Sequence, residues 1–472
     1  MQATQITIIG GGFCGIMTAV HLLRNREAPL DIHIINKDNP LAKGVAYNPH
    51  TASLLLNVPN GKISAFDDMP DHFTNWLINE QPELAGIDNI SELFATRQQY
   101  GRYLVHAWNE ALANKPNHIT VTTYDDEALD IVQEVDCFHI ILKQHPVLIA
   151  DFVVLATGNV IPALPAGLPA AFGNSKRYFG NPWKKACVEI QDPKTDVLII
   201  GNGLTMVDTV IGLVEHGFKC NIHTISPNGY QLKPASDANP SYPDADIKAL
   251  MQNKPSLLTI VSYLNKHRKI AVDSNRSFLP VIDAFRPYSQ QTWQRLSFGE
   301  KKRFLKYFSN AWNTVRHRLP VMMYAFMEKM QTEKRLFTNR GGIISINETN
   351  NKVIVTLNCG GEIRTLGVQS VINCTGPGSN LSKSANKLLR NIASKALICP
   401  DALNMGINAD PETGMVITAD GCCNPNLYAI GGNLKGMLWE STAVPELRTQ
   451  AKMLAAHLLK KCRYSWQLNP VA

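Results

Sequence analysis

Three glycines near the start of the chain have the spacing of a phosphate-binding turn. Gly10, Gly12 and Gly15 follow the apolar run 6–9, and apolar residues at helical spacing come next, over 16–23. In such a strand–turn–helix unit the first glycine permits the turn, the second lets the backbone approach a pyrophosphate, and the third lets the helix pack on the strand. The helix N-terminus adds unpaired N–H groups and a positive dipole end. We therefore expect a dinucleotide to bind here.

The residue expected to hold the adenosine ribose is not the usual acid. In dinucleotide-binding units a carboxylate at the end of the second strand accepts hydrogen bonds from the ribose hydroxyls. Here the predicted strand 30–35 is followed by Asn36, with Lys37 after it. An amide oxygen can accept the same bond, but without the strength that charge adds. We keep the dinucleotide prediction and expect an altered ribose contact.

A second turn of the same kind occurs in the middle of the chain. The apolar run 197–200 leads into Gly201 and Gly203, and a helical pattern follows. Met206 stands at the place of the third glycine, so an ordinary strand–helix unit is the alternative interpretation. However, two such units with an Ala-Thr-Gly turn at 156–158 between them are more specific than either alone. The pattern favours a protein that binds two dinucleotides.

Composition limits the class of protein. The chain has 472 residues, 45% of them hydrophobic, which is enough for two domains with separate cores. Its 46 basic and 39 acidic residues give a net charge of +7 that is spread along the chain, so a nucleic-acid partner is not expected. There is neither a signal segment nor a run of about eighteen apolar residues, so we expect a cytoplasmic protein without a membrane partner. The ten cysteines lack Cys-x-x-Cys and metal-ligand spacing, which predicts reduced thiols, no metal site and no disulfide-reductase mechanism.

The order of the segments predicts an α/β fold with two Rossmann-like dinucleotide-binding domains and a mostly helical insert. A strand-turn-helix pattern near the C-terminus would complete the first domain late, which makes that domain discontinuous, with residues 1–165 and 340–472. The second domain is predicted at 190–339, with the insert at about 230–336. The polar, proline-rich stretch 227–243 is predicted to be a mobile loop.

Several motifs together resemble those of a known family. They are GGGFCG (10–15), GVAY (44–47), LLLNVP (54–59), DHFTNWL (71–77), RQQYGRYL (97–104), LATGN (155–159), NPW (181–183), GNGLTMVD (201–208), DAFRP (283–287), WNTVRHRLP (312–320), NCTGP (373–377) and GMLWESTAVPELRTQA (436–451). With them the chain resembles, nearly end to end, the YdhS-like FAD/NAD(P)-binding flavoproteins. Distant relatives of that family include N-hydroxylating flavin monooxygenases. The resemblance implies FAD on the first unit and NADH or NADPH on the second.

The resemblance also implies cofactor-binding residues, but no catalytic residue. For FAD they are Gly10, Gly12, Phe13, Cys14, Gly15, Asn36, Lys37, Asn57, Val58, Arg97, Thr157, Gly158, Gly431, Gly432, Leu438, Trp439 and Glu440. For the nicotinamide nucleotide they are Gly201, Gly203, Leu204 and Thr205. By position in the motifs, Arg97 would face a flavin phosphate. The residues from 431 to 440 would line the ribityl and isoalloxazine groups.

Two departures from the family pattern narrow the chemistry. Relatives tend to carry Ser-Arg-Arg-Gly where this chain has Ser-Pro-Asn-Gly at 226–229, so the arginines that would hold a 2′-phosphate are absent. We therefore expect NADH to serve at least as well as NADPH. The segment 178–183 lacks the histidine of the Baeyer–Villiger enzymes, so we set that subclass aside.

We interpret the chain first as an FAD-dependent oxidoreductase, and within that class as a flavin monooxygenase acting on a small polar substrate that bears an amino or carboxylate group. The flavin does the redox chemistry, so no acid–base pair is required, and none is evident. Arg316, His317 and Arg318 are either candidates for binding a substrate carboxylate or a basic helix face in water. Two alternatives stay open: a flavin reductase or dehydrogenase without oxygen insertion, and a non-catalytic FAD-binding protein with a degenerate nicotinamide site. The sequence assigns no oligomeric state.

Overall fold

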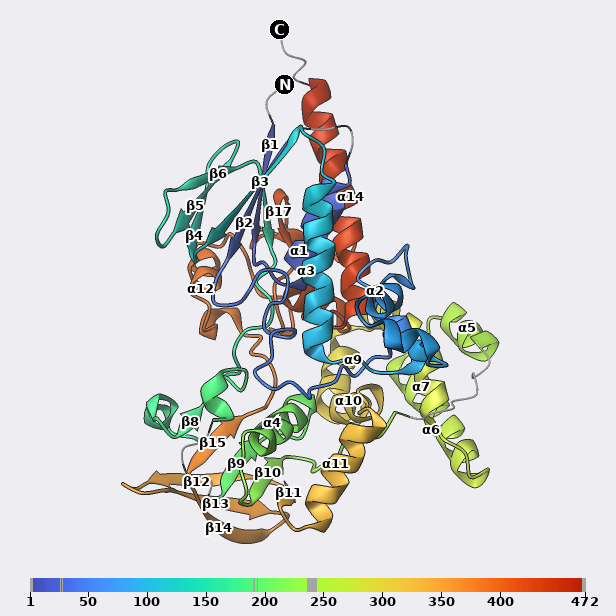
Figure 1. Cartoon of the computed structure of the whole chain (residues 1–472), viewed down its shortest axis with the longest axis vertical. Coiled ribbons are helices and arrows are strands. Elements are labelled where there is room, and N and C mark those ends of the chain that lie inside the picture. Colours follow the sequence, from blue (N-terminus) through green and yellow to red (C-terminus); the bar gives the residue numbers. More distant parts are fainter. Residues whose placement is uncertain are drawn as a thin grey trace. The chain divides into compact units, whose positions relative to one another are not determined.

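The computed structural model divides the chain into two compact units (Figure 1). It describes residues 3–25, 27, 29–189, 192, 194–235 and 244–468. Unit 1 comprises Met1–Ala52, Val58–Val160 and Gly378–Ala472, and unit 2 comprises Ser53–Asn57 and Ile161–Pro377. The predicted α/β fold with two Rossmann-like units is confirmed.

Unit 1 is built on a six-stranded sheet with the order β16-β17-β7-β1-β2-β3. The strands are β1 (Thr4–Ile9), β2 (Leu30–Asn36), β3 (Ile119–Asp125), β7 (Phe152–Leu155), β16 (Met415–Ile417) and β17 (Cys423–Ala429). The pairs are parallel except β16 with β17. Every residue of β7 is buried, as expected of a central strand covered on both faces. Because β17 pairs with β7, the N-terminal and C-terminal parts of the chain build one sheet.

Three long helices pack together in unit 1 (Figure 1). They are α1 (Phe13–Leu23), α3 (Arg97–Ala113) and α14 (Val444–Leu468). The shorter helices are α2 (His72–Glu80), α12 (Lys387–Ser394) and α13 (Lys435–Leu438). A small antiparallel sheet of β4 (Ala128–Gln133), β5 (Phe138–Leu142) and β6 (Leu148–Ala150) packs with α12 in a core that also takes in residues of β7 and β17.

Unit 2 contains a five-stranded parallel sheet with the order β11-β10-β9-β15-β8. Its strands are β8 (Tyr178–Phe179), β9 (Val197–Ile200), β10 (Ile222–Ser226), β11 (Leu336–Arg340) and β15 (Ser370–Asn373). Helix α4 (Leu204–Glu215) follows β9, and its apolar residues lie in the core with those of β9. The antiparallel strands β12 (Gly342–Glu348), β13 (Val353–Cys359) and β14 (Glu362–Val368) form a meander.

The predicted insert is helical. Its helices are α5 (Asp244–Gln252), α6 (Leu257–Asp273), α7 (Leu279–Phe285), α8 (Ser289–Arg295), α9 (Phe298–Arg303), α10 (Ser309–Arg316) and α11 (Val321–Thr332). The loop predicted at 227–243 falls partly outside the described residues, since 236–243 are not among them. Its described part, 227–235, contains no helix and no named strand.

The boundary between the units differs from the predicted one. Residues 340–377, predicted with the first domain, belong to unit 2, because β15 hydrogen-bonds to β9. A parallel sheet takes strands from distant parts of the chain, and the apolar run of β15 does not show which sheet it joins. The short segment Ser53–Asn57 also groups with unit 2, where Leu54 is part of the core. Asn57 and Val58, predicted at one site, are therefore assigned to different units.

Candidate functional site

The first glycine turn has two positions where a side chain cannot fit and one where it can. Gly10 has a φ of +118°, and a Cβ there would lie 2.1 Å from the Ala156 carbonyl oxygen. A Cβ at Gly15 would lie 1.9 Å from the Gly10 oxygen, so the helix packs directly on the turn. At Gly12 the nearest heavy atom would be the Gly44 Cα at 3.7 Å. The space beside Gly12 is therefore open, as a phosphate cradle requires.

Helix α1 presents its N-terminus at this open space. It begins at Phe13 with Gly12 as its N-cap, and no side chain caps it. The first N–H groups of a helix have no partner within the helix, and together with the helix dipole they favour an anion. Cys14 lies in this first turn, and burial raises the pKa of its thiol to about 12. A thiol whose pKa is raised in this way is a poor nucleophile at neutral pH.

Two further segments, 44–47 and 97–104, lie around the turn. The loop at 44–47 approaches the glycine turn through Gly44. A Cβ added at Gly44 would lie 3.3 Å from the Gly12 Cα. The same loop packs on α3, because a Cβ added at Gly101 would lie 2.2 Å from the main-chain carbonyl oxygen of Tyr47. Arg97 at the start of α3 donates from Nη1 to the carbonyl of residue 46 at 3.5 Å. The structure thus brings Arg97 to the loop that faces the glycine turn.

The C-terminal segment meets the same turn from another direction. A Cβ at Gly431 would lie 2.8 Å from the Cys14 Sγ. A Cβ at Gly432 would lie 2.3 Å from the side-chain oxygen of Asn159. Asn433 donates from Nδ2 to the Leu155 carbonyl at 3.0 Å, which ties the segment to the end of β7. Of the two glycines predicted from the sequence, Gly431 therefore packs on the first turn and Gly432 on the segment after β7, while Asn433 was missed.

Trp439 is the strained position of this segment. With a φ of 62° and a ψ of −65°, Trp439 is the central residue of a γ-turn. In this turn the Glu440 N–H donates to the Leu438 carbonyl oxygen at 2.7 Å. A bulky residue with positive φ costs free energy, and such positions concentrate at functional sites. The Lys435 ammonium lies 5.6 Å from the centroid of the Trp439 indole, and burial lowers the pKa of Lys435. The turn fixes Leu438, Trp439 and Glu440 in one rigid corner.

Of the remaining residues predicted to contact FAD, Asn36 has a free hydrogen-bond acceptor, whereas Lys37 is already paired. Asn36 donates from Nδ2 to the Asn39 carbonyl at 2.7 Å, so its Oδ1 can accept a hydrogen bond from a ribose hydroxyl. Lys37 forms an ion pair with Glu127, so its charge is already compensated. Thr157 and Gly158 follow β7, and a Cβ at Gly158 would meet no atom within 4 Å.

Unit 2 repeats the turn with one change. Gly201 has a φ of +111°, and a Cβ there would lie 2.4 Å from the Cys374 oxygen. Gly203 is the N-cap of α4, with Leu204 and Thr205 as the first helical residues, and a Cβ at Gly203 would meet nothing within 4 Å. Between the glycines, both amide atoms of Asn202 are buried and, within the described ranges, have no hydrogen-bond partner. A buried amide without a partner fits a site that a ligand completes.

The departure at Met206 has a structural explanation. Its side chain is 6% exposed and belongs to the core of unit 2, between the sheet and α4. In unit 1 the corresponding Gly15 lets helix α1 lie directly against the main chain of the turn. In unit 2 the Met206 side chain packs in the core at the same place. The missing third glycine therefore changes how the helix packs and leaves the open position at Gly203 unchanged.

Arg318, a candidate for binding a substrate carboxylate, already has an acidic partner in the structure. Arg318 makes a bidentate ion pair with Asp283 at 2.8 and 2.9 Å, so it ties α7 to the end of α10.

Among the residues that the structure describes, no group of three or more His, Cys, Asp or Glu side chains could hold a metal ion. In the same part of the chain, no helix combines the length and apolar character needed to cross a membrane.

The fold and the two glycine turns define an α/β protein with two dinucleotide-binding units, and known proteins agree with this class. Residues 7–160 match the model of the FAD-NAD(P)-binding family. The L-aspartate N-monooxygenase (nitrosuccinate-forming) of Streptomyces davaonensis is 25% identical over 253 residues, which cover 43% of this chain and 37% of that protein. The match thus spans little more than a third of that relative.

Two solved structures resemble the whole chain. The ornithine N-hydroxylase of Kutzneria sp. 744 has a TM-score of 0.67 at 15% identity, covering 98% of this chain and all of that one. The L-lysine 6-monooxygenase of Pseudomonas syringae has a TM-score of 0.65 at 16% identity, with the same coverage. At these identities the likeness establishes the fold.

Proposed function

We propose that this chain is an FAD-dependent monooxygenase that is reduced by NADH or NADPH and hydroxylates an amino group of a small amino-acid-like substrate. The curated relative and the two structural neighbours are named for N-oxygenation of aspartate, ornithine and lysine. Their common feature is an amine on a small polar molecule. Within the FAD-NAD(P)-binding proteins we further propose that the chain is YdhS-like, on the motifs quoted above.

The observation that carries the proposal is the open cradle at Gly12. The uncapped start of α1, the open face of Gly12 and the free acceptor on Asn36 suit a pyrophosphate with its attached ribose. The residues of unit 1 therefore fit FAD. When bound, FAD supplies the redox chemistry, accepting a hydride and activating oxygen. The protein would hold the pyrophosphate at Gly12 and place the flavin end near the rigid corner of residues 438–440.

The cysteines are not arranged as disulfides in the structure. All ten cysteines are free, and Cys422 and Cys423, although adjacent and exposed, are not bonded to each other. Burial raises the pKa of the Cys14 thiol at the first turn to about 12, so it would remain protonated at neutral pH. We propose the cytoplasm as the location, because the spacing of the ten cysteines in the sequence is that of reduced thiols.

The test starts with the purified protein and its bound flavin, which is released by heat and identified as FAD or FMN by chromatography. Reduction by NADH and by NADPH is then followed anaerobically, and oxygen is added with aspartate, ornithine, lysine and simple diamines. We expect one substrate to give a product heavier by one oxygen atom and bearing a hydroxylamine.

Two results would overturn the proposal. Flavin reduction without oxygen incorporation into any amine would establish a reductase or dehydrogenase. Failure of both NADH and NADPH to reduce the flavin would establish a non-catalytic FAD protein.

A further inference from the structure

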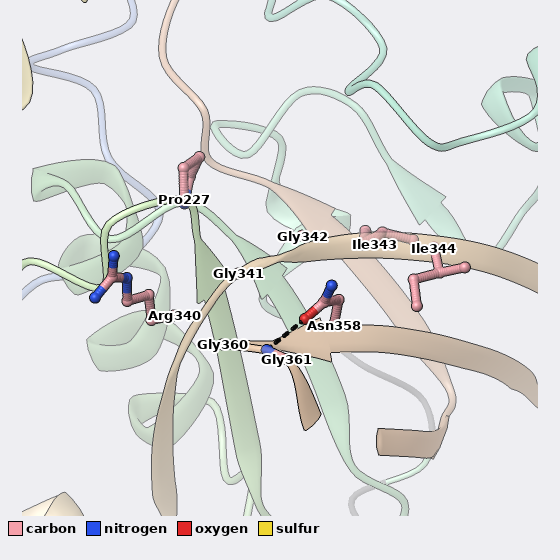
Figure 2. Close-up of a pocket in the computed structure, with 9 residues that line it drawn as sticks. All are labelled: Pro227, Arg340, Gly341, Gly342, Ile343, Ile344, Asn358, Gly360 and Gly361. Carbon is pink, nitrogen blue, oxygen red and sulfur yellow. Dashed lines mark hydrogen bonds between the residues drawn. The ribbon is translucent and has the colours of Figure 1, made fainter. Parts of the chain in front are cut away.

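A hollow of about 520 Å³ lies in unit 2 where β10 and β11 end (Figure 2). It is lined by Pro227, Arg340, Gly341, Gly342, Ile343, Ile344, Asn358, Gly360 and Gly361. Arg340 is the only charged residue among these nine, and none of them is acidic. The volume is in the range of small-molecule sites. A single cation in a glycine-rich hollow suits a ligand with one anionic group.

Arg340 is placed here by strand pairing. It is the last residue of β11, and in the parallel ladder it stands beside Ser226, the last residue of β10. β10 in turn pairs with β9, whose end carries Gly201. Neighbouring strands are about 4.8 Å apart, so Arg340 is about 10 Å across the edge from the glycine turn. That is close to the span from a dinucleotide's pyrophosphate, across its ribose, to the far side of the ribose ring.

The turn after β10 is shaped around Arg340. Gly229 has a φ of +63°, and a Cβ there would lie 2.9 Å from the Arg340 Cβ. The Ser226 Oγ accepts the Gly229 N–H at 3.1 Å and keeps its own hydrogen to donate. Figure 2 shows the Arg340 side chain pointing away from Asn358. The Arg340 stem thus packs on the segment where relatives were expected to carry their arginines.

The polar groups of the hollow are free to bind. Arg340 is exposed, and no hydrogen bond or ion pair holds its guanidinium within the described part of the chain. Asn358 accepts the Gly361 N–H at 2.8 Å through Oδ1, which fixes its amide with the nitrogen on the opposite side (Figure 2). Among the nine described residues that line the hollow, Arg340 offers a guanidinium and Asn358 an amide donor, and none carries a carboxylate. The Ser226 hydroxyl is contributed by the residue paired with Arg340 in the strand ladder.

We propose that Arg340 binds the 2′-phosphate of the nicotinamide dinucleotide and gives this protein a preference for NADPH over NADH. This inference rests on the proposed function for the use of a nicotinamide dinucleotide. It reverses the expectation from the sequence, which looked for a cation after β10, whereas the cation comes from β11. A guanidinium can bind a phosphate with two parallel hydrogen bonds, which adds both affinity and selectivity.

The test is a binding experiment with the full chain, titrating 2′,5′-ADP and 5′-AMP by calorimetry. One charge-assisted contact is worth about tenfold in affinity. We expect the parent to bind 2′,5′-ADP at least about tenfold more tightly than 5′-AMP. We expect Arg340→Ala to abolish most of that difference and to leave 5′-AMP binding unchanged, with Arg340→Lys in between. Arg364→Ala is the matched control, since Arg364 is an exposed arginine of the neighbouring meander paired with Glu362.

Three results would overturn the inference: equal binding of the two probes by the parent, an unchanged ratio in Arg340→Ala, or an equal loss of both probes in that variant. The outcome is independent of catalysis, because the probes carry no nicotinamide. A protein that hydroxylates amines but does not distinguish the probes would refute only the inference. One that distinguishes them but oxidises no amine would refute only the proposed monooxygenase activity.

Discussion

Gly12 and Gly15 lie in one turn, yet substitutions there should fail in different ways. A Cβ at Gly12 meets no protein atom closer than 3.7 Å, so Gly12→Val should fold with a nearly unchanged melting temperature. Its side chain would fill the cradle, and we expect the purified variant to be colourless. Gly15→Val would place a Cβ 1.9 Å from a carbonyl oxygen and should lose stability as well as flavin. Flavin absorbance and thermal unfolding by circular dichroism separate the two effects. Retention of flavin by a folded Gly12→Val would contradict the cradle.

At the scale of the element, helix α1 contains a histidine that couples its packing to pH. Burial, with a smaller effect of Arg24, lowers the pKa of His21 from 6.5 to about 4. The folded state thus disfavours the charged form, and its stability falls as the pH drops from about 6.5 to about 4. The loss at pH 4.5 relative to pH 7 is about 2 kcal/mol for this group. Urea unfolding of His21→Leu should therefore show a smaller loss than the parent. Parallel pH profiles would contradict this role.

Helix α3 holds the 44–47 loop through one glycine. A Cβ at Gly101 would lie 2.2 Å from the Tyr47 oxygen, so Gly101→Ala should push the loop away from the helix and from Gly12. We expect a loss of about 1–3 kcal/mol in stability and weaker retention of flavin. Gly86→Ala is the control, because a Cβ there meets nothing within 4 Å. Equal stability and flavin content in the two variants would show that the loop does not depend on this contact.

At the scale of the whole molecule, the long segment of unit 2, Ile161–Pro377, is flanked by two residues of unit 1 that are hydrogen-bonded to each other. The Gly378 N–H donates to the Val160 oxygen at 3.1 Å, so the chain leaves unit 1 and returns to it at neighbouring points. Replacing 161–377 by a short Gly-Ser linker should therefore leave unit 1 able to fold. We expect a yellow protein that neither NADH nor NADPH reduces, measured by flavin content and by anaerobic bleaching. A colourless but folded fragment would mean that unit 2 is needed for FAD binding.

The sequence by itself determined the parts of the fold that depend on neighbours along the chain. Gly10, Gly15 and Gly201 stand out because a tight turn between a strand and a helix excludes side chains locally. The apolar runs of β1 and β9 identify buried strands for the same reason. The two Rossmann-like units and the helical insert followed from these local patterns.

Only the tertiary structure decided which distant segments meet. The pairing of β15 with β9 moved 340–377 into unit 2, and the pairing of β11 with β10 placed Arg340 beside Ser226. Strand order depends on contacts between residues far apart in the chain, and an apolar strand carries no signal for its neighbour. For the same reason the expectation of NADH, drawn from the residues next to Ser226, took no account of Arg340 on the adjacent strand.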